Sequence, residues 1–154
     1  MLLGYDSIDW KDLFKFSLFI SKKVFMNTLE IQAGLAVTPG YQYAQPVGNQ
    51  LFVAGQVPHG IEGNLVGIGS PHAQASQCLK NLRTLMNLYG FSDRDIRQLK
   101  IYVVGDHANL TNAWQAVAEW FDNAVPPATL LGVFLLGHEN QLVEIDATIV
   151  RIES

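Results

Sequence analysis

Residues 125–152 read VPPATLLGVFLLGHENQLVEIDATIVRI, and this stretch decides the fold class. It predicts two long strands joined by the polar turn Gly137-His138-Glu139-Asn140. Residues 130–136 are almost unbroken in apolar side chains, so we expect a strand buried on both faces. Residues 142–152 alternate between apolar and polar side chains, which predicts one core face and one polar face. The rest of the chain is expected to cover this pair.

The polar face of the last strand carries the first candidate for chemistry, Glu144. It lies beside Asp146 and Thr148 in a strand that is otherwise strongly hydrophobic. A carboxylate in such a strand is costly to bury unless a hydrogen bond stabilises it, and perturbed carboxylates gather at functional sites. A solvated strand face would explain the same residues equally well.

The composition favours one domain that associates with copies of itself. Apolar residues make up 49% of the 154-residue chain, whereas charged residues make up 16%, well below the roughly 25% of typical soluble domains. A monomer with so little charge would expose apolar patches, so we expect a homo-oligomer. The net charge of −4 and the scattered lysines and arginines argue against a nucleic-acid partner.

The cysteine and histidine content predicts no cofactor and no metal site. Cys78 is the single cysteine, which excludes an intramolecular disulfide and is compatible with a reducing, cytoplasmic compartment. We expect it to be a small buried side chain on the apolar face of a helix. His59, His72, His107 and His138 lack metal-ligand spacing. No phosphate-loop or dinucleotide motif occurs, and no apolar run of about 18 residues predicts a membrane span.

The first 25 residues are expected to lie outside the domain, which we place at residues 26–154. They contain no secretory signal, because the basic residues follow the apolar part. Two interpretations remain open: a short amphipathic docking helix that begins after Ser7, or an upstream extension of the reading frame with Met26 as the natural start. The second is favoured.

From Met26 onward the chain alternates strand and helix signals. Strands are predicted at residues 29–32, 41–47, 51–56 and 100–104, with a hairpin turn at Gly48-Asn49. Ser70-Pro71 begins a helix that Gly90 ends, and Asn109 is expected to cap a second helix. The sum is an α+β fold, with two helices on one face of a mixed sheet.

Six segments stand in a characteristic order: YAQPVGNQLFVAGQVP, QCLKNLRTLM, LKIYVV, NLTNAWQAVAEWF, PPATLLGV and LVEIDATIV. In this order and spacing they resemble the RidA family, also called YjgF or the endoribonuclease L-PSP family, from about residue 29 to residue 152. The resemblance implies a chorismate-mutase-like α+β fold and a homotrimer with three ligand clefts between neighbouring subunits. Active members of the family hydrolyse reactive 2-iminoacids and their enamine tautomers.

The resemblance also implies a site made of a tyrosine, an arginine from the motif P-A-R-S and a glutamate from the final strand. The tyrosine falls on Tyr43, and the glutamate, which helps to place the attacking water, falls on Glu144. The strand motif VAGQVP puts Ala54 and Gly55 at the floor of the cleft. Trp114 replaces a smaller polar residue near the cleft, where it either narrows the pocket or is a core tryptophan of the second helix.

The arginine that holds the substrate carboxylate in relatives is absent. The segment PPATLLGV places Ala128 or, with a shift of one residue, Thr129 at its position, and neither replaces a bidentate guanidinium contact. Losing a charge-assisted hydrogen bond of roughly 1.5–3 kcal/mol weakens an acidic substrate by about tenfold to 150-fold. We therefore expect a trimer that binds a small, uncharged or weakly acidic metabolite, without efficient arginine-dependent 2-iminoacid deaminase activity.

Two alternatives remain open. The first is an enzyme that hydrolyses a different imine or a related carbonyl compound, with Glu144 placing water and Tyr43 orienting the substrate. The second is a regulatory or chaperone-like binding protein without turnover. An endoribonuclease ranks last, because the net charge is unfavourable and no acid/base pair of histidines is evident.

Overall fold

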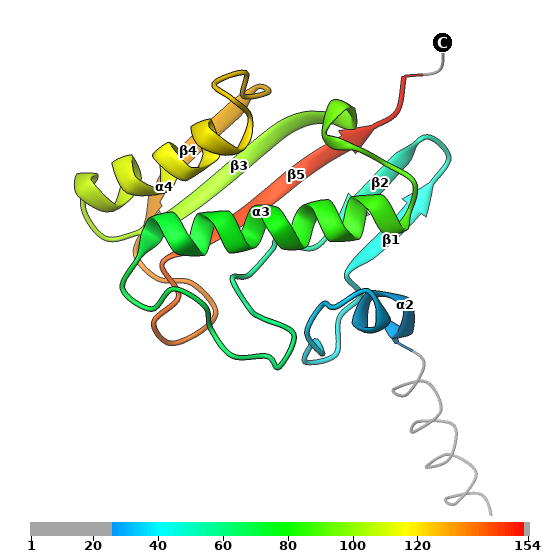
Figure 1. Cartoon of the computed structure of the whole chain (residues 1–154), viewed down its shortest axis with the longest axis horizontal. Helices are drawn as coiled ribbons and strands as arrows, with labels where there is room; N and C mark the ends of the chain where they lie inside the picture. Colours follow the sequence, from blue (N-terminus) through cyan, green and yellow to red (C-terminus); the bar gives the residue numbers. More distant parts are fainter. Residues whose placement is uncertain (1–25, 153–154) are drawn as a thin grey trace, which may run out of the picture.

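The computed structural model describes residues 26–152, in which helices lie against one face of a five-stranded sheet (Figure 1). The prediction for residues 1–25 lies outside the described residues. In spatial order the strands are β1 (Ala44–Val47), β2 (Gln50–Val53), β5 (Val143–Val150), β3 (Ile96–Val104) and β4 (Ala128–Val133). Of the described pairs, β3 and β4 are parallel and the others are antiparallel. The predicted α+β fold with a mixed sheet is confirmed.

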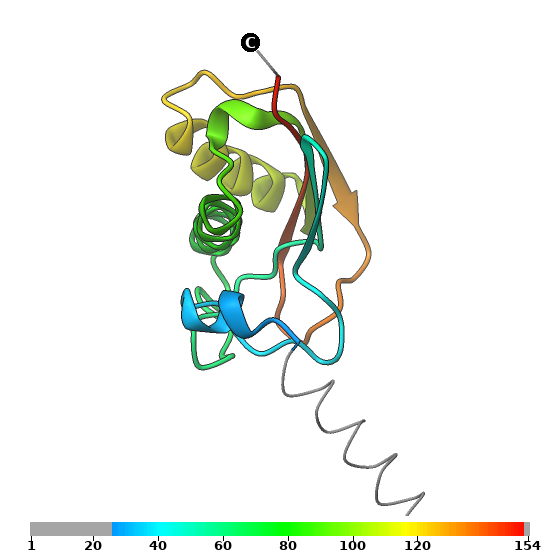
Figure 2. The same ribbon diagram turned by 90° about the vertical axis from the view of Figure 1, so that its right-hand side faces the viewer.

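The helices form one layer on the sheet. Figure 2 shows α2 (Thr28–Gln32), α3 (Pro71–Leu88) and α4 (His107–Trp120) on the same side. The side chain of Ser70 accepts the backbone N–H of Ala73 at 3.2 Å, which confirms the predicted start of α3. Gly90 follows its last turn with a φ of 74°, a conformation that glycine adopts at little cost. Within this described part no helix has both the length and the apolar content that crossing a bilayer demands.

The cap of α4 differs from the prediction. Asp106 caps the helix, because its carboxylate accepts the backbone N–H of Asn109 at 3.1 Å. Asn109 lies inside the first turn, where its side-chain amide donates to the carbonyl oxygen of Val104 at 2.8 Å. Both residue types suit a cap, so the sequence pattern alone did not separate them.

The predicted strand at residues 29–32 is also wrong, since this segment is the helix α2. A segment of four residues is too short for its periodicity to distinguish a helix from a strand. Asn27 precedes the helix in a left-handed conformation with a φ of 60°. Its side-chain amide donates to the carbonyl oxygen of Tyr41 at 2.8 Å, and its side-chain oxygen accepts the N–H of Tyr43 at 3.0 Å. These bonds tie the helix to the segment that leads into β1.

The two strands of the C-terminal stretch do not pair with each other, because β3 lies between β4 and β5. β4 is an edge strand that ends at Val133, and four of its six residues are exposed in the single chain. The expectation of a strand buried on both faces is therefore wrong for one chain. Phe134, which follows it, is 92% exposed, and Leu135 is exposed as well.

The core lies between the sheet and the two long helices. The alternation predicted for β5 is confirmed, since Val143, Ile145 and Ile149 are buried in this core. Cys78 packs there from α3, and burial raises the pKa of its thiol well above the ordinary value. The thiol is therefore an inert core side chain, as predicted.

Candidate functional site

The sheet face opposite the helices carries the polar side chains of β5 and β3. Since Val143 faces the core, the alternation of β5 places Glu144 and Asp146 on this outer face. The antiparallel register pairs Tyr102 with Glu144 and Lys100 with Asp146. The ammonium group of Lys100 lies 3.9 Å from a carboxylate oxygen of Asp146.

The carboxylate of Glu144 lies directly over Gly55. A Cβ atom at position 55 would stand 2.1 Å from Oε1 of Glu144, so any larger residue would displace the carboxylate. The other oxygen, Oε2, accepts a hydrogen bond of 3.1 Å from the side-chain amide of Gln141, which is only 3% exposed. A glycine and a buried amide thus define where this carboxylate lies. A cavity of about 320 Å³ adjoins it, lined by Val53, Gly55, Tyr102, Leu136, Glu144 and Asp146.

The segment after β2 brings Gly55 to this place. Gln56 and Ile145 exchange two backbone hydrogen bonds, of 2.7 and 3.1 Å, which hold the segment beside β5. The N–H of Ala54 donates to the carbonyl oxygen of Tyr43 at 2.9 Å, and its own carbonyl accepts the side-chain amide of Gln56 at 2.6 Å. Of the two predicted floor residues, Gly55 contacts Glu144, whereas Ala54 joins the strands through its backbone.

Tyr43 occupies a structural position. Its ring is 9% exposed and its hydroxyl donates to the carbonyl oxygen of Ala36 at 2.9 Å. Burial, with smaller effects from nearby groups, raises the pKa of Tyr43 to about 12. Because this hydroxyl donates its hydrogen to Ala36, we expect the neighbouring Tyr41 to be the better placed of the two tyrosines to orient a substrate, and the role of Tyr43 stays a prediction.

Tyr41 is the tyrosine on which the charge of Glu144 acts. It is 38% exposed, and its ring meets the ring of Tyr43 edge-on with centroids 6.3 Å apart. Burial raises the pKa of Tyr41, and the negative charge of Glu144 raises it further. The sequence contains two tyrosines two residues apart; the hydroxyl of Tyr43 is held by its hydrogen bond to Ala36, whereas Tyr41 is the more exposed of the two.

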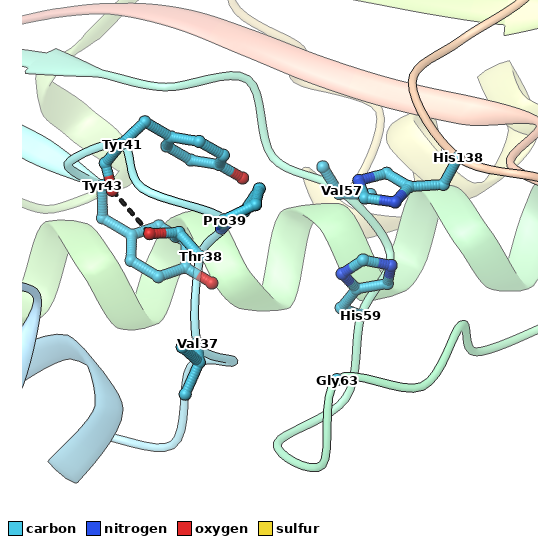
Figure 3. A pocket seen from close by; sticks show the side chains of 9 residues that line it. All are labelled: Val37, Thr38, Pro39, Tyr41, Tyr43, Val57, His59, Gly63 and His138. Carbon is cyan, nitrogen blue, oxygen red and sulfur yellow. Dashed lines mark hydrogen bonds between the residues drawn. The ribbon is translucent and has the colours of Figure 1, made fainter. Parts of the chain in front are cut away.

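A second cavity, of about 330 Å³, opens beside Tyr41 (Figure 3). Tyr41 projects from one wall, while His59 and His138 stand together on the opposite wall. The centroids of the two imidazole rings are 4.5 Å apart and the rings are inclined at 70°. Burial, and then the neighbouring His138, lower the pKa of His59. The statement that no pair of histidines is evident is therefore wrong, because two distant loops bring this pair together.

Gln141 connects the histidine cavity to Glu144. Its side-chain oxygen accepts the backbone N–H of His138 at 3.1 Å, while its amide nitrogen donates to Glu144. One buried amide therefore spans from the wall of the cavity to the carboxylate.

The register of β4 distinguishes Ala128 from Thr129. Leu130 packs against the core, so residues of the opposite parity point to the outer face. Thr129 thus shares the face of Glu144 and pairs with Lys100, whereas Ala128 belongs to the helix side. Within residues 26–152, no arginine lines either cavity.

Trp114 lies on α4, in the layer on the other face of the sheet, and is 37% exposed. It lines neither cavity of the single chain, and it is not enclosed in the core. Across the described residues no three His, Cys, Asp or Glu side chains gather as metal ligands would.

Comparisons with known proteins agree with this architecture. The family model for Endoribonuclease L-PSP matches residues 31–151. A RutC family protein of Pyrococcus horikoshii is 28% identical over 109 residues, which cover 70% of this chain and 83% of the relative. A solved structure from Thermotoga maritima is 25% identical, has a TM-score of 0.70, and covers 84% of this chain and 98% of that one. The YjgF structure of E. coli is 22% identical with a TM-score of 0.69, covering 79% and 95% respectively. The chain therefore belongs to the endoribonuclease L-PSP family, which includes the YjgF, RidA and RutC proteins.

Proposed function

We propose that the chain binds a small, uncharged or weakly acidic metabolite in clefts shared between the copies of a homotrimer. The observation that carries this function is the carboxylate of Glu144, held over Gly55 by Gln141 on the open face of the sheet. The two cavities, of about 320 and 330 Å³, lie at the lower end of the range of typical ligand pockets, so a metabolite of a few carbon atoms suits them.

Assembly is supported by the apolar side chains that one chain leaves uncovered. Phe52, Leu131, Phe134 and Leu135 are all exposed, and they lie on or near the strands of the open face. Such a surface is typical of an interface, and the low content of charged residues points the same way. We place Trp114, exposed on the other layer, at the seam with a neighbouring copy, where it narrows the cleft.

We further propose that 2-iminoacids are poor substrates. Thr129 occupies the outer-face position that matches the family arginine, and a hydroxyl group does not hold a carboxylate in a bidentate contact. Lys100 lies beside it, but the charge of Lys100 is offset by Asp146. The proposed site therefore lacks a free, permanent positive charge for an acidic substrate.

A second candidate function is the hydrolysis of a different imine. Glu144 is preorganised by two neighbours, which is what a general base requires. It would take a proton from water as the water oxygen adds to the imine carbon, and the nitrogen would gain a proton before the amine leaves. The charge of this carboxylate acts on Tyr41, which takes the role first expected of Tyr43. Endoribonuclease activity remains disfavoured by the net charge alone.

A turnover screen separates the binder from the enzyme. Imines with and without a carboxylate are offered to the parent protein, to Glu144→Gln and to Asp146→Asn, a control on the same strand face. Hydrolysis that Glu144→Gln abolishes and Asp146→Asn retains identifies the hydrolase. Binding without hydrolysis identifies the binder. Efficient hydrolysis of 2-iminobutyrate by the parent would contradict the proposed function.

A further inference from the structure

The pair formed by His59 and His138 is built into the fold. The carbonyl oxygens of Val57 and His59 both accept hydrogen bonds of 3.0 Å from the side-chain amide of Asn81 on α3. Gln77 donates to the carbonyl of His59 at 3.3 Å, and Gln141 holds the backbone of His138. Both loops are therefore anchored by largely buried amides, so the imidazoles meet in a defined arrangement.

The groups around the histidine pair are neutral, except for one carboxylate that lies beyond Gln141. Facing it across the cavity are Tyr41 and Tyr43, while α3 presents only neutral amides to the loop of His59. Beyond Gln141 lies the carboxylate of Glu144, which repels an anion. Glu62 and Glu139 belong to the histidines' own loops and do not line the cavity. Among the residues that line this cavity, His59 and His138 are the ones that can carry a positive charge, so an anionic group is most stable beside the imidazoles.

Two imidazoles this close do not both gain a proton readily, because their positive charges repel each other. Burial and His138 already hold the pKa of His59 low. An anion beside the rings offsets that repulsion and accepts an N–H from each. Anion binding and proton uptake at this pair are therefore coupled.

We propose that His59 and His138 together hold the carboxylate of a small organic acid in this cavity. The carbon skeleton of the acid lies against Val37, Pro39 and Val57, and the hydroxyl of Tyr41 faces it across the cavity. This assignment rests on the proposed function, because it takes the cavity as part of the ligand cleft. The pair supplies a conditional positive charge in a chain that has no arginine at Thr129.

The coupling between proton uptake and anion binding determines how strongly the affinity for a carboxylate depends on pH. When one proton is taken up with the anion, the affinity falls by about tenfold for each pH unit above the pKa of the free pair. A carboxylate is thus bound more tightly near about pH 6 than near about pH 8, because a lower pH favours the proton uptake that accompanies anion binding.

NMR spectroscopy of the histidine ring protons in the full chain tests the pair. The ligand is 2-oxobutyrate, and 2-butanone is the matched ligand without a carboxylate. We expect the signals of His59 and His138 to shift with 2-oxobutyrate alone, with binding at least tenfold tighter near about pH 6 than near about pH 8. Unshifted signals, equal shifts with both ligands, or an affinity independent of pH would overturn the assignment.

Substitutions give an independent readout. The double variant His59→Gln/His138→Gln keeps hydrogen-bonding side chains but leaves no imidazole in the cavity to take up a proton, so it should abolish the pH dependence of 2-oxobutyrate binding. His107→Gln, at an exposed residue of α4, is the control and should retain it. Equal pH dependence in the double variant and in the control would show that the carboxylate binds elsewhere.

The two proposals fail separately. If 2-oxobutyrate shifts the histidine signals while no imine is bound or hydrolysed, the anion site stands and the proposed function falls. If an uncharged imine is bound or hydrolysed but 2-oxobutyrate leaves the histidines unchanged, the function stands and the anion site is wrong.

Discussion

Replacing Gly55 by alanine tests the placement of the Glu144 carboxylate without any assumption about a substrate. The three heavy atoms nearest to a Cβ at position 55 all belong to Glu144, at 2.1, 2.9 and 3.2 Å. An ordinary contact begins at 3.4 Å, so the closest oxygen must withdraw by about 1.3 Å. Such a displacement removes the hydrogen bond between Gln141 and Glu144, at a cost of about 1–2 kcal/mol for a half-buried carboxylate.

The effect of Gly55→Ala on the free energy of unfolding should change sign when Glu144 is absent. The backbone at Gly55 lies outside the left-handed region, so alanine fits there once the carboxylate is gone. Gly55→Ala should then stabilise the fold by about 0.4–1 kcal/mol, because alanine restricts the unfolded chain. In the Glu144→Ala background the amide of Gln141 keeps a partner, the carbonyl oxygen of Val143 at 3.2 Å.

The assay is denaturant unfolding of the four proteins of this double-mutant cycle, at one fixed protein concentration. Gly132→Ala is the matched control, because its Cβ would meet only a methyl group of Leu110, at 3.9 Å. We expect Gly55→Ala to destabilise the parent and to stabilise Glu144→Ala. Gly132→Ala should change the free energy of unfolding by the same amount in the parent and in Glu144→Ala. Equal effects of Gly55→Ala in the two backgrounds would refute the contact between Gly55 and Glu144.

Three further predictions concern the tyrosines and the assembly. Glu144→Gln should lower the pKa of Tyr41, because the negative charge of Glu144 raises it, but burial should still keep this pKa above the ordinary value of 10.0. NMR of labelled tyrosine rings measures the pKa, and an unchanged value would show that Glu144 and Tyr41 do not interact. Tyr43→Phe should destabilise the fold by about 1 kcal/mol and leave ligand binding intact, because it removes the hydrogen bond to Ala36. Tyr41→Phe should leave the stability unchanged and weaken ligand binding; calorimetry of both variants measures stability and affinity, and the reversed pattern would contradict these roles. A chain shortened to begin at Met26 should sediment as a trimer like the full chain, and a concentration-independent monomer would remove both the shared cleft and the dispensability of residues 1–25.

The sequence predicted those elements whose signals are local. Ser70 and Gly90 delimit α3 by their own conformations, and the alternation of β5 survives because one face meets the core. The errors arose where distant partners decide. Asn27 turns an apolar run into a helix by bonding to residues 41–43, and β3 separates β4 from β5.

In the candidate site, too, features with a local sequence signal were predicted and features that depend on distant partners were not. Glu144 was predicted from a carboxylate in the middle of an apolar strand, but its contact with Gly55 depends on a pairing between distant segments. The sequence favoured Tyr43 over Tyr41, and the hydrogen bond that engages the Tyr43 hydroxyl with Ala36 is invisible in the sequence. His59 and His138 were missed, since no spacing reveals that two separate loops meet. The pairing of Gln56 with Ile145 and the amides of Asn81 and Gln141, all distant in sequence from at least one of the loops, bring them together.

The central claim is that this family member lacks the fixed positive charge that an acidic substrate requires. Hydrolysis of 2-iminobutyrate, measured near about pH 8 where an ordinary imidazole is largely neutral, tests it in the parent, in Thr129→Arg and in Ala128→Arg. The parent should show little hydrolysis, Thr129→Arg should raise it, and Ala128→Arg should not, because the register places only Thr129 on the face of Glu144. Hydrolysis by the parent at a rate comparable to arginine-containing relatives would contradict the claim and show that another group holds the carboxylate.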